Sequence, residues 1–233
     1  MSFQPMKSHR LSKPLSIPGL ALAFLLLAFP LSAAPPSLPT GMTSASGASM
    51  IDDLLHSVAA IAESPDLDPS QKMAQVESII RNSLDLDGMT TRVLQGLQAD
   101  FSENEQQAFS AVFQEYLVTH FLQRAAGLKS DHIEVIGSEN TDSGVVVKTR
   151  GGIRSPLFWT RSQTRPHQTR ADYFLDLNSV PPRIQRILID GIDVLQNFRS
   201  QFNGLLRRQS PEELIQLLER KTEDLQKKNP FAR

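Results

Sequence analysis

Residues 187–206 read ILIDGIDVLQNFRSQFNGLL and contain both periodicities from which the fold is built. Ile187 and Ile189 alternate with their neighbours, which is the period of a half-buried strand. After Gly191 the apolar residues recur with the 3.6-residue period of a helix: Leu195, Phe198, Phe202, Leu205 and Leu206. Asp193 stands where a helix N-cap is expected. The segment therefore predicts a strand that ends at Gly191 and passes directly into a helix.

Upstream, the same alternation occurs in three further segments, at 133–135, 145–147 and 173–177. Residues 140–144, NTDSG, have the composition of a hairpin loop between the first two. Consecutive strands joined by short loops predict a mostly antiparallel sheet of about four strands, one face of which must be covered.

Helical periodicity lies on both sides of this sheet. It is strongest at 102–122, where Ser102 and Glu105 have capping-box spacing, and it recurs at 51–61, 69–80, 89–97 and 211–225. Further starts are indicated by Ser49 with Asp52, by Asp68-Pro69 and by Ser210-Pro211. The fold class predicted is α+β: a curved sheet covered by helices.

The N-terminus has the features of an export signal. Residues 1–34 carry Lys7, Arg10 and Lys13 and no acid, and residues 17–29 are apolar. This apolar run is shorter than the roughly 20 residues that cross a bilayer. We expect a cleavable signal peptide at 1–33, a flexible Pro/Ser/Gly-rich leader at 34–48, a folded domain at 49–228 and a tail at 229–233.

The composition excludes several chemistries. The chain has 233 residues, no cysteine and a net charge of −1, so disulfides, thiolate catalysis and zinc–cysteine sites are ruled out and no nucleic-acid partner is expected. The charge is polarised, with net −11 over 51–145 and +7 over 146–233. Either the halves attract each other in one fold, or the basic stretch forms a face for an anionic partner. That stretch comprises Lys148, Arg150, Arg154, Arg161, Arg165 and Arg170.

No motif for catalysis or metal binding is present, and we predict neither kind of site. Asp85-Leu-Asp87-Gly88 lacks the later ligands of a calcium loop and indicates a helix boundary instead. Asp190 and Asp193 are explained by a strand end and a helix cap. His120 falls on an apolar helix face, as a histidine of the core or of a pocket rim does. Phenylalanine is abundant on the amphipathic faces, which fits either a filled core or an apolar ligand cavity.

The C-terminal run resembles the MlaC / toluene-tolerance family of periplasmic phospholipid carriers. The resemblance is carried by Ile189-Asp190-Gly191-Ile192-Asp193, by NFRSQF at 197–202, by the segment 86–94 and by the helix at 102–121. It extends over roughly residues 50–222. Two departures are Pro181-Pro182 before the last strand and a longer, more basic segment at 151–170.

The resemblance implies a cone related to the NTF2-like fold, with an apolar pocket for acyl chains. It implies a periplasmic shuttle of a Gram-negative cell, with phospholipid as cargo and no cofactor. The implied partners are an inner-membrane ABC-type lipid transporter and an outer-membrane lipoprotein–porin complex, which together maintain outer-membrane lipid asymmetry.

Candidate contact residues follow from the predicted faces. Those expected to contact acyl chains are Phe113, Tyr116, Val145, Val147, Tyr173, Leu175, Ile187, Ile189, Leu195, Phe198 and Phe202. Those expected to contact a headgroup or a partner are Arg199, Arg150 and Arg154. Two other functions remain open: an exported hydrolase on a cone-like fold, and a protein-interaction adaptor with a filled core.

Overall fold

The computed structural model describes residues 43–97, 101–151, 169–176 and 179–232. The helices are α1 Ser44–Glu63, α2 Pro69–Ser83, α3 Leu86–Leu94, α4 Glu103–Ala125, α5 Val194–Leu206 and α6 Pro211–Gln226, with a 3₁₀ turn at Ser130–His132. The strands are β1 Glu134–Thr141, β2 Gly144–Arg150, β3 Arg170–Asp176, β4 Arg183–Ile189 and β5 Ile192–Asp193. The predicted signal peptide and most of the predicted leader lie outside the described residues. Among the described helices, none combines the length and the apolar character needed to span a bilayer.

The α+β prediction is confirmed, with one more strand than expected. The five strands follow chain order, β1-β2-β3-β4-β5, and each pair is antiparallel. The additional strand, β5, is two residues long and follows a tight turn at Asp190 and Gly191, whose φ angles are 49° and 78°. Two consecutive positive φ angles fold the chain back on β4, as in the turns typical of short hairpins.

Asp190 and Asp193 have the structural roles that the sequence predicts. The carboxylate of Asp190 accepts a hydrogen bond from the Arg170 backbone N–H at 2.9 Å, which fixes the strand end. The carboxylate of Asp193 accepts hydrogen bonds from the first backbone N–H groups of α5, at 2.9 and 3.0 Å, and the Arg186 guanidinium of β4 donates to it at 2.6 Å. Asp193 therefore joins the end of the sheet to the start of α5.

Most helix starts are where the sequence places them, but α1 begins earlier. Asp68, Ser102 and Ser210 are N-caps with reciprocal capping boxes, as predicted. The cap of α1 is Thr43 and not Ser49, so residues 44–48, which the sequence assigns to the leader, are helical. Thr43 and Ser46 form a reciprocal capping box there. A Cβ at Gly47 would lie 2.7 Å from a methyl carbon of Val145, so glycine also allows this first part of α1 to approach β2 closely.

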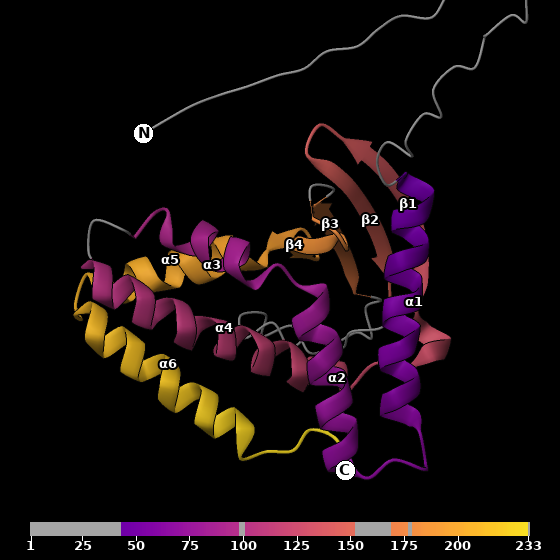
Figure 1. Cartoon of the computed structure of the whole chain (residues 1–233), viewed down its shortest axis with the longest axis horizontal. Coiled ribbons are helices and arrows are strands. Elements are labelled where there is room, and N and C mark those ends of the chain that lie inside the picture. The colour runs from indigo at the N-terminus through magenta and orange to yellow at the C-terminus, as the bar shows by residue number, and fades with distance from the viewer. Residues whose placement is uncertain (1–42, 98–100, 152–168, 177–178, 233) are drawn as a thin grey trace, which may run out of the picture. The chain divides into compact units, whose positions relative to one another are not determined.

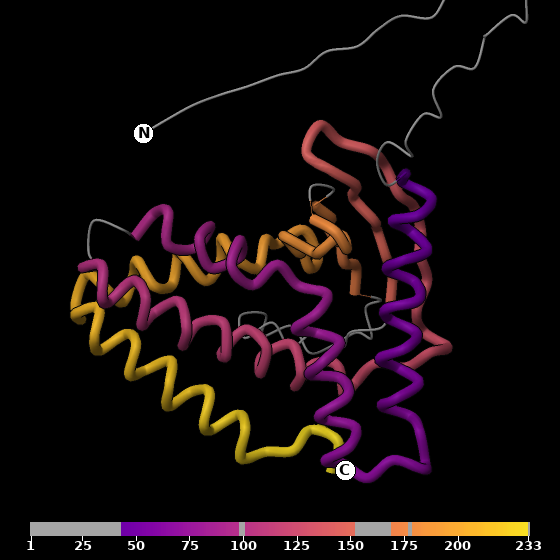
Figure 2. Tube along the Cα trace, in the orientation of Figure 1, coloured from indigo at the N-terminus to yellow at the C-terminus, as the bar shows by residue number. Residues whose placement is uncertain are grey.

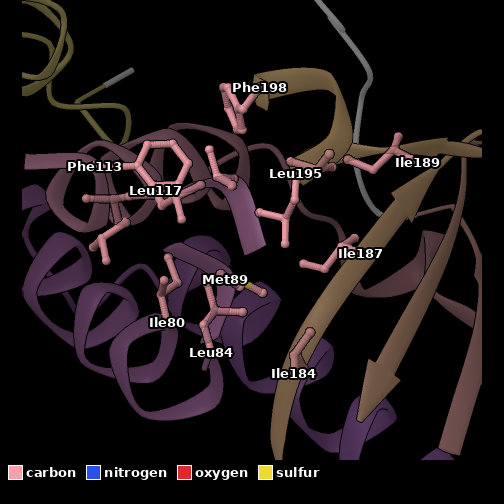
Figure 3. Close-up of a cluster of buried hydrophobic side chains, with 14 of the residues drawn as sticks. Ile80, Leu84, Met89, Phe113, Leu117, Ile184, Ile187, Ile189, Leu195 and Phe198 are labelled. Atoms are coloured by element: carbon pink, nitrogen blue, oxygen red, sulfur yellow. The ribbon is translucent and has the colours of Figure 1, made fainter. Parts of the chain in front are cut away.

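The helices are arranged around the inner face of the sheet. In Figures 1 and 2, α1 lies along β1 and β2, while α4 runs between α6 on one side and α3 and α5 on the other. The inward residues of β2, β3 and β4 are buried, and they alternate along the strands except where an irregularity in the β3–β4 register separates Ile184 from Ile187: Val145, Val147, Tyr173, Leu175, Ile184, Ile187 and Ile189. The core thus lies between the sheet and the helices, and Figure 3 shows part of it.

Aromatic rings connect α4 to α5 within this core. Phe109 stacks on Phe113 of the same helix, with ring centroids 5.3 Å apart. Phe202 of α5 contacts both rings edge-on, at 5.7 and 5.6 Å, and Phe198 lies 5.6 Å from Phe113. Edge-to-face packing of this kind adds to the stabilisation from burial alone.

The predicted C-terminal tail belongs to the folded domain. Phe231 is only 9% exposed and joins the hydrophobic core. The side-chain amide of Gln123 donates hydrogen bonds to the carbonyls of Leu225 and Lys228, both at 2.9 Å, and so holds the end of α6 against α4. Within the predicted tail at 229–233, the described residues are held against the domain by the burial of one aromatic ring.

Replacing Phe109 with Ala is expected to lower the free energy of unfolding by about 3–5 kcal/mol, because this fully buried ring contacts Phe101, Phe113 and Phe202. Urea denaturation followed by circular dichroism measures the loss. The matched control is Ala111→Ser on the exposed side of the same helix, expected to change stability by less than about 0.5 kcal/mol. Equal effects of the two substitutions would contradict the assigned packing.

Candidate functional site

A cavity of about 550 Å³ lies where the C-terminal ends of α4 and α6 meet the start of α5 and the end of β4. Tyr116, His120 and Arg124 of α4 line it, spaced four residues apart and therefore on one helix face. The remaining lining residues are Phe121, Ile189, Val194, Asn197, Phe198, Gln201, Lys221, Asp224, Leu225 and Lys228. The cavity is thus formed by segments from both halves of the sequence.

The inner wall of the cavity is apolar and rigidly packed. The Phe198 ring lies 5.7 Å from Tyr116 and 5.4 Å from His120, edge-on to both. Ile189 and Val194 are also buried there. Figure 3 shows Phe198, Leu195 and Ile189 at this end of the core. Such a wall favours aliphatic or aromatic ligand groups and disfavours bound water.

His120 is a neutral member of this wall. Burial, and secondarily the positive charge of Arg124, lowers the pKa of His120 to about 3, so the imidazole carries no charge at neutral pH. The Tyr116 hydroxyl is also neutral, because burial raises its pKa. The sequence predicts that His120 lies in the core or at a pocket rim, and the structure confirms this.

The mouth of the cavity is polar and mostly cationic. Arg124 is half-buried, and its guanidinium donates a hydrogen bond to the backbone carbonyl of His120 at 3.2 Å. Burial lowers the pKa of the Arg124 guanidinium, although an arginine remains charged at neutral pH. The side chains of Lys221 and Asp224 on α6, and of Lys228 just after it, are exposed. The site therefore joins an apolar interior to a charged rim.

The volume of the cavity limits the size of the ligand that it can hold without a conformational change. A methylene group fills about the volume of one water molecule, about 30 Å³, so the cavity has room for roughly 18 such groups, or about one long acyl chain. The lining contains His120 and Asp224 but no serine, threonine or other hydroxyl nucleophile besides the tyrosine. Among the described residues, no group of three or more potential metal ligands is present. This arrangement is suited to binding an amphipathic molecule.

The structure divides the predicted acyl-contact residues into two groups. Tyr116, Ile189 and Phe198 line the cavity. The others are buried in the core and do not line it: Phe113, Val145, Val147, Tyr173, Leu175, Ile187, Leu195 and Phe202. Phe113 and Phe202 lie directly behind Phe198, whose ring contacts both.

The predicted headgroup residues lie away from the cavity. The Arg199 side chain passes over Gly96 and bonds to Gln196 of its own helix. Arg150 forms an ion pair with Glu134 of β1 at 3.4 Å, and Lys148 one with Glu139 at 3.0 Å. These pairs join the basic and acidic halves of the chain. Arg154, like Arg161 and Arg165, lies outside the described residues.

The cationic residues at the mouth were not singled out from the sequence. Arg124 follows the last apolar turn of its helix, where a basic residue is commonly explained by the helix dipole. Lys221 lies in a helix of mixed charge, and Lys228 follows the end of that helix. Neither lysine is recognisable as a site residue from the sequence, because the cavity depends on α4 and α5 as well.

The fold and the site define a class of small α+β proteins whose helices enclose an apolar cavity against an antiparallel sheet. The chain belongs to the MlaC family: the family described as "MlaC protein" matches residues 48–220.

A solved structure gives the same fold. The phospholipid-binding protein from Ralstonia solanacearum, determined in complex with a phospholipid, superposes with a TM-score of 0.58 at 18% sequence identity. The match covers 78% of this chain and 98% of that one. No curated protein matches the chain in sequence.

The buried neutral His120 predicts a loss of stability in mild acid. Its pKa is about 3 in the folded protein and near 6.5 when unfolded, so between these values only the unfolded state takes up the proton. Stability is therefore lost as the pH falls below 6.5, by about 2 kcal/mol between pH 7 and pH 5. The positive charge of Arg124 on the same helix disfavours the imidazolium further, and Lys221 and Lys228 are the other cationic residues of the cavity lining.

Urea denaturation of the wild-type protein and of His120→Gln at pH 7 and pH 5 measures this contribution. The variant is expected to lose about 2 kcal/mol less than the wild type over this interval, because carboxylates contribute equally to both. An identical pH dependence in the two proteins would show that His120 is not held neutral by burial.

Proposed function

We propose that this protein binds a phospholipid with an acyl chain in the cavity and its phosphate at the cationic mouth. The observation that carries the proposal is the junction of an apolar wall, formed by Phe198, Ile189 and Val194, with a rim containing Arg124. A phospholipid has the same polarity along its length. Membership in the MlaC family and the phospholipid in the related Ralstonia structure support this choice of ligand.

The energetics explain why a membrane lipid requires such a carrier. Exposing two chains of about 16 carbons to water costs on the order of 25 kcal/mol, at about 0.8 kcal/mol per methylene. Burial of the chains in a protein removes most of this cost while the lipid crosses an aqueous compartment.

We infer that the protein is exported to the periplasm and shuttles lipid between an outer-membrane complex and an inner-membrane ABC-type transporter, thereby maintaining outer-membrane asymmetry.

The second acyl chain requires the cavity to widen. Room for about one chain is present, and Phe198 separates it from the rings of Phe113 and Phe202. We propose that Phe198 turns aside when a diacyl lipid enters, so that these two rings and the inner face of the sheet come into contact with the second chain. The buried residues predicted as acyl contacts would then belong to the loaded site.

Binding is favoured over hydrolysis by the chemistry of the lining. A hydrolase needs a nucleophile or an activated water beside a base. Here the one histidine is neutral and packed between aromatic rings, and Asp224 forms an ion pair with Lys227 at 3.3 Å. Neither group is arranged to activate a nucleophile. We therefore propose a binding protein without catalytic activity.

The test uses protein expressed from its full coding sequence and purified without detergent. Organic extraction followed by mass spectrometry is expected to find about one phospholipid per chain. Gln201→Trp places a large ring in the cavity mouth and is expected to reduce bound lipid at least fivefold, because the indole occupies acyl-chain volume. Asn203→Trp, on the same helix but exposed and outside the lining, is the matched control and should retain lipid.

Circular dichroism and thermal denaturation confirm that both tryptophan variants fold. Folded wild-type protein that carries no lipid, and takes none up from vesicles, would overturn the proposed function. Equal lipid content in both variants would place the lipid elsewhere in the molecule.

A further inference from the structure

The charge at the cavity mouth is one-sided. Three cationic side chains line it: Arg124 from α4, Lys221 from α6 and Lys228 from the segment after α6. The lining contains one carboxylate, Asp224, and this group already pairs with Lys227, which is not part of the lining. The lining therefore contains three cations and one carboxylate, which gives it a net positive charge.

Arg124 differs from two other half-buried arginines, Arg81 and Arg186. Arg81 lies between Glu77 and Glu115, at 2.8 and 2.7 Å, and Arg186 pairs with Asp193 at 2.6 Å. For Arg124, by contrast, no described carboxylate is an ion-pair partner, and its guanidinium donates a hydrogen bond to a backbone carbonyl. A cation that has lost part of its hydration without gaining a counter-ion is energetically unfavourable.

A ligand phosphate would supply the missing counter-ion. The guanidinium presents donors in a planar fork that matches a phosphate group, and Arg124 uses one of its nitrogens for the His120 carbonyl. Asn197 and Gln201 add amide groups on the opposite side of the mouth. All diacyl phospholipids offer this phosphate, so Arg124 alone does not distinguish among headgroups.

The two lysines provide the distinction. Lys221 lies on α6 and Lys228 lies two residues beyond its end, and both line the cavity beside the place where the headgroup leaves it. A zwitterionic headgroup would bring its ammonium group close to these two ammonium groups, whereas a glycerol headgroup brings no positive charge. Repulsion between like charges disfavours the zwitterionic lipid, so the mouth favours the lipid with the glycerol headgroup.

We propose that the mouth formed by Arg124, Lys221 and Lys228 selects phospholipids of net negative charge, such as phosphatidylglycerol, over zwitterionic phosphatidylethanolamine. This inference rests on the proposed function and specifies the cargo of the same cavity. The selectivity is expected to be about fivefold, as befits partly solvated charges, and to weaken with increasing salt.

The experiment offers the full-length expressed protein vesicles that contain equal amounts of phosphatidylglycerol and phosphatidylethanolamine with identical acyl chains. After exchange the protein is separated from the vesicles, and the bound lipids are counted by mass spectrometry. The wild type is expected to carry phosphatidylglycerol in about fivefold excess. The double variant Lys221→Gln/Lys228→Gln is expected to bind the two lipids in nearly equal amounts.

The matched control is Arg207→Gln/Arg208→Gln, which removes the same charge from two exposed residues outside the cavity lining. It should retain the wild-type ratio. Excess inorganic phosphate should leave the bound lipid in place, because free phosphate gains nothing from the apolar wall.

The outcomes separate this inference from the proposed function. Lipid bound without headgroup preference in the wild type would overturn the selectivity and leave lipid binding intact. Equal loss of preference in both double variants would show that the preference depends on the overall charge of the protein. Displacement of the lipid by phosphate would show that the mouth is a site for the free anion. Either result would overturn the inference. Absence of any bound lipid would count against the proposed function itself.

Discussion

The structure depends on how the aromatic face of α4 packs against α5. Phe198 of α5 lies against Tyr116 and His120, whereas Phe202 lies against Phe109 and Phe113. At the Phe109 end the rings contact one another on every side and fill the core. At the other end α6 and the residues after it supply lysines and an aspartate instead of further rings, and a cavity of about 550 Å³ remains. The same face of α4 therefore packs in the core along one half of its length and lines the candidate ligand cavity along the other half.

The polarity of the cavity follows from the same arrangement. Desolvation keeps His120 and Tyr116 neutral inside, where a charge would oppose the entry of an acyl chain. Charge appears one turn further along α4, at Arg124, where the helices separate and solvent enters. The bond from Gln123 to the end of α6 keeps the lysine-bearing wall beside Arg124. The cavity surface therefore changes from apolar inside to charged at the mouth, as an amphipathic ligand does from its acyl chain to its headgroup.

Local interactions explain which parts of the fold were predictable. The caps at Asp68, Ser102, Asp193 and Ser210 each involve residues within three positions of one another, and the sequence predicts all four. Three further features involve partners that are distant in the sequence. Helix α1 extends back to Ser44 where Gly47 meets Val145, the chain end is ordered by burial of Phe231, and β5 forms because β4 is available to pair with it.

The sequence by itself determined the order of helices and strands, the position of most helix caps and the membership in the MlaC family, because these depend on local hydrogen bonds and on residue patterns. It also placed His120 at the edge of an apolar face. Only the tertiary structure decided which apolar residues line the cavity and which fill the core. Apolar residues that line the cavity have the same periodicity in the sequence as apolar residues that fill the core. The cavity itself depends on the spacing between α4, α5 and α6. The same spacing brings Arg124 beside Lys221 and Lys228, about 100 residues away in the sequence.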